Sequence, residues 1–109
     1  MIDRKKIKVF VNEVVRQFQP ERVVLFGSYA YGKPGNDSDV DLLVIMPHEG
    51  HSAIQSAEIR NRIHAGFPLD LIVRSPDEIK KRLAINDFFI AEILDQGETL
   101  YDVHHARVG

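Results

Sequence analysis

The chain has 109 residues, of which 44% are hydrophobic and 28% charged, and its formal net charge is −2 at pH 7. These values fit one globular domain that can form a single sheet with a layer of helices. The acidic balance argues against autonomous nucleic-acid binding, which needs many cations, and the absence of cysteine excludes disulfides and thiolate metal sites. No apolar run reaches the roughly 20 residues that span a membrane, and we expect a cytoplasmic protein.

Apolar residues recur at helical spacing in several segments, each bounded by helix-start or helix-stop residues. The expected helices lie over residues 7–18, from Ser52 to Gly66, from the capping box of residues 75–78, and from Asn86 to Gly97. Short apolar runs predict strands over residues 23–26, 39–46 and 67–74, with an edge strand over residues 98–101. We find no linker or repeat, so we expect one domain over residues 1–109, with a frayed polar tail over residues 102–109.

The strand over residues 23–26 leads directly into Gly27 and Ser28. A turn of this kind before a helix start exposes backbone N–H groups to which phosphate oxygens can bind, and a serine hydroxyl can donate to a phosphate. An ordinary strand-to-helix turn can contain the same two residues. The Gly-Ser pair therefore indicates a phosphate site only in combination with the acidic residues that follow it in the chain.

Two aspartates, Asp39 and Asp41, enter the next apolar run. Residues i and i+2 of a strand point to the same face, so the two side chains should project side by side, with Cα atoms roughly 6.5–7 Å apart. Like charges repel there, and a divalent cation removes the repulsion; Mg²⁺ prefers a few carboxylates together with substrate phosphates.

A third acid, Asp70, interrupts the following apolar strand and can fall beside the pair if the two strands are neighbours. Three carboxylates on one sheet face could hold two Mg²⁺ ions roughly 3.5–4 Å apart, as in two-metal phosphoryl chemistry. Acids that only solvate the ends of strands remain the alternative.

The spacing of these residues resembles that of a known group. Gly-Ser, ten further residues, Asp-x-Asp and a later strand acid resemble the DNA polymerase β-like nucleotidyltransferase superfamily, and the run GSYAYGKPGNDSDVDLLV over residues 27–44 is similar to its minimal, MNT-type members. The resemblance implies an α+β fold with two layers, in which a small mixed β-sheet carries helices packed mainly on one face.

The resemblance also implies roles for single residues. Gly27 and Ser28 would contact the triphosphate of the nucleotide. Asp39 and Asp41 would bind both the nucleotide-bound and the catalytic metal. Asp70 would bind the catalytic metal and accept the proton of the attacking hydroxyl.

One position departs from the pattern of the minimal members. Many of them have an arginine where Tyr31 stands, so Lys33 and Arg74 are the nearest candidate cations for a phosphate of the nucleotide. A solvated strand-end cation is the alternative interpretation of Arg74. Loss of the guanidinium could weaken triphosphate binding but leaves the metal ligands intact.

The resemblance implies Mg²⁺-dependent transfer of an NMP, with AMP from ATP expected, to an acceptor hydroxyl. We expect the acceptor on a HEPN-type helical partner protein, with this chain as the antitoxin of a toxin–antitoxin pair. The adjacent Phe88 and Phe89 cannot easily share one core stripe, so one of them could contact a partner. Two alternatives stay open: a non-catalytic antitoxin that neutralises its partner by contact, and a small-molecule, aminoglycoside-like transferase, for which a homo-oligomer could build the cleft.

Overall fold

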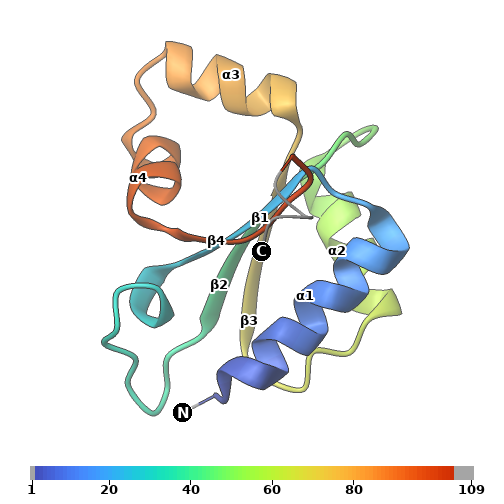
Figure 1. Ribbon diagram of the computed structural model, residues 1–109. Helices are drawn as coiled ribbons and strands as arrows, with labels where there is room; N and C mark the ends of the chain where they lie inside the picture. The colour runs from blue at the N-terminus through green and yellow to red at the C-terminus, as the bar shows by residue number, and fades with distance from the viewer. Residues whose placement is uncertain (1, 105–109) are drawn as a thin grey trace.

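The computed structural model describes residues 2–104, which form a four-stranded mixed sheet with helices on both faces (Figure 1). The strand order is β3-β2-β1-β4; β1 is antiparallel to β2 and to β4, and β2 is parallel to β3. The elements in chain order are α1 (Arg4–Phe18), β1 (Arg22–Phe26), the short 3₁₀ helix η1 (Gly27–Tyr29), β2 (Val40–Ile45), α2 (Ser52–Arg62), β3 (Leu69–Arg74), α3 (Pro76–Ala84), α4 (Phe88–Gln96) and β4 (Glu98–Asp102).

The larger of two hydrophobic cores lies between the sheet and the helices α1 and α2. The apolar stripe predicted for the first helix faces this core, and its buried members are Ile7, Phe10, Val11 and Val14. From α2, Ile59 and Ile63 reach the same core. The helical spacing of the N-terminal apolar residues therefore predicted the packing face of α1 correctly.

The second core lies on the opposite face, where α3 and α4 pack against β1 and β2. Its buried residues are Val24, Phe26, Leu43, Ile45, Ile79, Ile90 and Ile93. The α+β class and the mixed sheet are confirmed, but the helices are divided between two faces, and only the larger core follows the expectation of one main face. The reason is that β1 and β2 are apolar at almost every position, and such strands need cover on both sides.

Several element boundaries differ from the sequence-based prediction by one or two residues. Ser52 is the first residue of α2, and His51 occupies the cap position. Asp87, rather than Asn86, caps α4, because Asn86 adopts a left-handed conformation with φ of 58° in the preceding turn. The helix start expected at the turn of Gly27 and Ser28 is the 3₁₀ turn η1.

The polar tail begins later than the sequence predicts. Asp102, expected to be frayed, ends β4, and the N–H of Val103 donates to the carbonyl of Glu21 at 2.9 Å, so pairing with β1 holds the beginning of this segment. Residues 105–109 lie outside the described part of the chain. Within residues 2–104, no helix is both long and apolar enough to cross a membrane.

The start of α3 provides a test of stability. Ser75 Oγ accepts from the N–H of Glu78 at 3.1 Å, and the Glu78 carboxylate accepts from the N–H of Ser75 at 2.8 Å, which confirms the predicted capping box. His48 Nε2 contacts the same carboxylate. Burial opposes ionisation of Glu78, but the hydrogen bonds from Ser75 and His48 outweigh it and hold the pKa of this carboxyl below its usual range.

We expect Glu78→Gln to lower the free energy of unfolding by less than about 1 kcal/mol near neutral pH, because the amide can keep the hydrogen bond to the N–H of Ser75 and solvent screens the lost charge. A carboxyl whose pKa is lowered by folding stabilises the fold above its unfolded pKa, and this contribution disappears as pH falls through the folded pKa. The difference between the variant and the wild type should therefore shrink below about pH 4. Urea unfolding at pH 7 and pH 3.5 measures it, with the exposed Glu49→Gln as control; an equal loss at both pH values would contradict the linkage to Glu78.

Candidate active site

Asp41 and Asp70 are neighbours across two parallel strands. The register of β2 and β3 pairs Asp41 with Asp70, near the beginning of each strand. Both residues alternate in phase with Leu43 and Ile72, which pack in the core beneath α4, so their side chains belong to that face of the sheet. The condition under which Asp70 can lie beside Asp41, that the second and third strands are neighbours, is met.

Gly27 brings the turn after β1 against the carboxylate of Asp41. Its φ is +72°, and a Cβ built on it would lie 2.0 Å from Asp41 Oδ2. A side chain there would force the Asp41 carboxylate to move, and the left-handed conformation itself favours glycine. The Gly27 carbonyl accepts the N–H groups of Ala30 and Tyr31, both at 3.1 Å, and so closes η1. Glycine at this position therefore lets the turn and the carboxylate approach each other closely.

The negative charges of the neighbouring aspartates act on Asp41. Burial, and then the negative charges of Asp70 and Asp39, raise the pKa of the Asp41 carboxyl. Asp39 is exposed and precedes the first residue of β2, Val40, so the side-by-side geometry of a strand does not apply to it. Among the described residues, no three Asp, Glu or His side chains form a group that could hold a metal ion. The pair that the strands bring together is Asp41 and Asp70.

A cavity of about 340 Å³ opens beside these two carboxylates. Its lining residues come from β1, η1, β2, β3, α4 and the turn after η1, and they are Phe26, Gly27, Tyr31, Asp41, Asp70, Phe89, Glu92 and Ile93. Tyr31, which stands where the resemblance leads us to expect an arginine, lies in the wall of this cavity. Phe89 packs edge-on against Phe26, with ring centroids 5.8 Å apart. We refer to this cavity as the Asp41–Asp70 pocket.

Four lining residues of the pocket were not assigned to it from the sequence: Phe26, Phe89, Glu92 and Ile93, of which the last three belong to α4. Sequence reasoning placed Phe89 only as a core residue or a partner contact. The spacing of apolar residues gives the inner face of α4 but not the part of the sheet that it covers. The adjacency of Phe88 and Phe89 was the one available signal that an aromatic ring of this helix lies outside the core.

The remaining predicted residues lie around or away from this pocket. Ser28 is half-buried in η1, and its carbonyl accepts the N–H of Lys33 at 3.0 Å; the Lys33 side chain is on an exposed loop. Arg74 lies four residues along β3 from Asp70, roughly 13 Å away. Its guanidinium donates to Ser52 Oγ at 3.0 Å and to the Val73 carbonyl at 2.8 Å. Arg74 therefore does not line the pocket, because Asp70 and Arg74 lie near opposite ends of β3.

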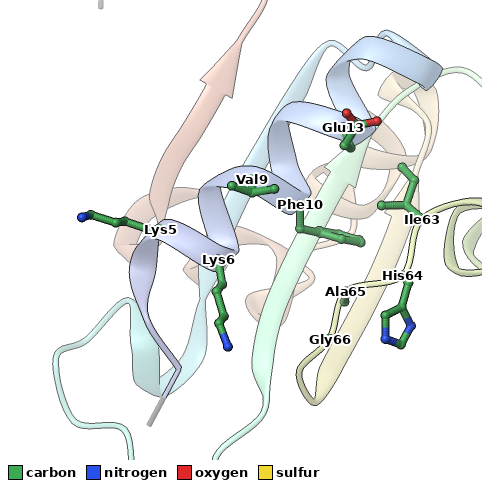
Figure 2. Close-up of a pocket in the computed structure, with 9 residues that line it drawn as sticks. All are labelled: Lys5, Lys6, Val9, Phe10, Glu13, Ile63, His64, Ala65 and Gly66. Atoms are coloured by element: carbon green, nitrogen blue, oxygen red, sulfur yellow. The ribbon is translucent and has the colours of Figure 1, made fainter.

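Another cavity, of about 390 Å³, lies between α1 and residues 63–66 (Figure 2). The ring of Phe10 points toward residues 63–66, and Lys5 and Lys6 stand at the rim (Figure 2). The one acid in its wall, Glu13, pairs with Arg16 at 2.7 Å. This cavity lacks paired carboxylates and does not offer the chemistry of the Asp41–Asp70 pocket.

Known proteins are similar to this chain in sequence and in fold. The family described as "Nucleotidyltransferase domain" matches residues 7–103. A protein of Methanocaldococcus jannaschii, named as a candidate protein adenylyltransferase, is 30% identical over 103 residues, which cover 93% of this chain and 100% of that protein.

Two crystal structures share the fold. One, of a candidate nucleotidyltransferase from Sulfolobus solfataricus, has a TM-score of 0.57 at 29% identity and covers 71% of this chain and 70% of that chain. The other, of a mutant of the toxin–antitoxin MntA–HepT, has a TM-score of 0.55 at 14% identity and covers 98% of this chain and 80% of that chain. This second likeness shows the fold alone. The chain therefore belongs to the nucleotidyltransferase domain family, as a minimal nucleotidyltransferase of the DNA polymerase β-like superfamily.

Proposed function

We propose that this nucleotidyltransferase moves AMP from ATP to a hydroxyl group of a partner protein, with Mg²⁺ held at Asp41 and Asp70. The observation that carries the proposal is the packing of the Gly27 turn against Asp41, directly beside Asp70. This arrangement puts a turn that suits phosphate next to two carboxylates that suit a cation. The name of the M. jannaschii relative, a candidate protein adenylyltransferase, supports a protein as acceptor.

The donor groups of the pocket fit Mg²⁺. Carboxylate oxygens are its preferred protein ligands, and it is commonly bound through one or two carboxylates together with substrate phosphates and water. The raised pKa of Asp41 reports burial and negative charge that no described cation offsets. When bound, Mg²⁺ neutralises charge on the phosphates during the displacement. In a site with two ions, Asp39 would add the third carboxylate.

The residues in and around the pocket would have separate roles in the reaction. Backbone N–H groups of Gly27 and Ser28 would orient the triphosphate, with Lys33 as the nearest loop cation. The acceptor oxygen forms a bond to the α-phosphorus, the bond from that phosphorus to the oxygen bridging to the β-phosphate breaks, and pyrophosphate leaves. Asp70 would take the proton of the acceptor hydroxyl. Positioning and charge complementarity account for the rate enhancement.

We further propose that the acceptor is a HEPN-type helical toxin, which this chain inactivates as an antitoxin. The likeness of fold to MntA of the MntA–HepT pair supports this class of partner. A second candidate, neutralisation of the partner by contact alone, is favoured by Tyr31, which stands in the pocket wall where an arginine would bind phosphate more strongly.

The test is incubation of the pure protein with Mg²⁺ and each α-³²P-labelled NTP, with and without the purified product of the neighbouring gene. We expect label from ATP on the neighbouring-gene product, and none after chelation of Mg²⁺. The Asp39→Ala/Asp41→Ala double variant should give no label. If that variant still neutralises the partner in cells, contact alone suffices; absence of label with every NTP would overturn the transfer proposal.

A further inference from the structure

We propose that the acceptor protein docks on an exposed apolar surface formed by Ile85, Phe88 and Phe89, at the turn from α3 into α4; the inference rests on the proposed function. We call these three residues the α3–α4 surface. The occupant we infer is a protein whose contact surface has an apolar centre and acidic residues at one side. Support comes from the exposure of the three side chains, the rigidity of the turn that carries them, and their continuity with the wall of the Asp41–Asp70 pocket.

The three side chains are unusually exposed for their size. The exposed fractions are 83% for Phe88, 73% for Ile85 and 52% for Phe89. They lie within five residues of sequence, between the end of α3 and the first turn of α4. Clustered apolar exposure of this kind marks an interaction site more often than single exposed residues do. Aromatic rings are also the side chains that most often dominate the energy of protein interfaces.

Hydrogen bonds fix the backbone turn that carries these side chains. Asn86 has a φ of 58°, and the N–H of Asp87 donates to the carbonyl of Arg82 at 3.0 Å. The Asp87 carboxylate caps α4 by accepting from the N–H groups of Phe89 and Ile90. Because Ile90 and Ile93 on the inner face of α4 are buried in the core, Phe88 at the first position of this helix remains outside the core. A contact surface that is already ordered loses less entropy on binding.

The surface is continuous with the Asp41–Asp70 pocket. Phe89 lines that pocket and packs on Phe26, and it is the chain neighbour of Phe88 at the start of α4. A macromolecule that presents a hydroxyl to Asp70 must cover this wall.

Charge beside the surface indicates the chemistry of the partner. Lys80 and Lys81 are exposed on α3, and Arg82 pairs with Asp87 at 3.3 Å. Two exposed lysines at the edge of an apolar surface are complementary to acidic residues at the rim of a partner. Such rim charges affect the rate of association and its salt dependence more than the affinity.

The test uses Phe88→Asp, with Ile54→Asp as matched control. Ile54 is 65% exposed on α2, which packs on the opposite face of the sheet. Phe88 does not line the pocket, and an aspartate in the first turn of a helix is compatible with the helix dipole. We expect Phe88→Asp to weaken binding of the purified neighbouring-gene product by about tenfold or more and to lower its labelling similarly at subsaturating concentration. Binding of Mg²⁺-ATP, measured calorimetrically, should not change.

The outcomes separate this inference from the proposed function. If the wild type labels the neighbouring-gene product and Phe88→Asp labels it equally well, the docking inference is overturned and the transfer proposal stands. If the wild type labels nothing, the transfer proposal fails and the docking inference fails with it. If Phe88→Asp instead converts a dimer into a monomer in sedimentation without weakening the partner, the surface joins two copies of this chain, which also overturns the inference. An equal loss in Ile54→Asp would show that the effect is not specific to the surface.

Discussion

Replacing Gly27 with alanine is expected to reduce the rate of nucleotide transfer by about 100-fold or more. The new Cβ would lie 2.0 Å from Asp41 Oδ2, far inside van der Waals contact, so the carboxylate or the turn must move. A displacement of roughly 1 Å in a catalytic arrangement can cost about 100-fold in rate. The left-handed φ of +72° adds a cost in stability of about 1–2 kcal/mol.

Gly66→Ala is the matched control for this prediction. Gly66 has a φ of +77°, and a Cβ built there meets nothing within 4 Å. It should show a similar loss of unfolding free energy with unchanged transfer, because it shares the backbone strain but not the collision. Urea unfolding and the labelling assay measure the two effects. Full activity in Gly27→Ala, or an equal loss of activity in Gly66→Ala, would show that contact with Asp41 is not what makes glycine necessary.

The adjacency of Asp41 and Asp70 could be predicted from sequence because each acid interrupts an apolar run near its start. Parallel neighbouring strands then bring the two residues into register. The role of Gly27 was predicted as close approach to phosphate. The structure adds a reason that no sequence pattern contains, namely that the Asp41 carboxylate occupies the space of the missing side chain.

Other features depended on boundaries and packing that local patterns do not determine. The prediction for Asp39 assumed a strand that includes it, whereas β2 begins one residue later. Arg74 is only four residues after Asp70 in sequence, but in an extended strand this spacing places it at the opposite end of β3. The contribution of Phe89 required knowing which face of the sheet α4 covers. Continuous apolar strands did indicate cover on both faces, and this signal could have predicted the second helical layer.

Asp41→Asn is expected to separate stability from activity. Burial, followed by the charges of Asp70 and Asp39, raises the pKa of Asp41, so folding disfavours its ionised form at neutral pH. An uncharged amide of the same shape removes this cost, and the variant should be more stable than the wild type at pH 7. Because the wild-type carboxyl becomes neutral as pH falls through its raised folded pKa, the advantage should shrink in acid. Transfer should nevertheless fall by about 100- to 1,000-fold.

The same variant tests whether the carboxylate pair binds the cation. A ligand that binds only the folded protein raises the melting temperature by mass action, so Mg²⁺-ATP should stabilise the wild type and fail to stabilise Asp41→Asn. The control is Asp95→Asn, an exposed carboxylate on α4 outside the pocket, which should keep both the stabilisation by Mg²⁺-ATP and the transfer activity. A gain in stability together with retained transfer in Asp41→Asn would mean that the charge of Asp41 destabilises the fold and is not needed for transfer. A gain in stability with both activities lost is the result expected of a carboxylate kept, at a cost to folding, for its substrate.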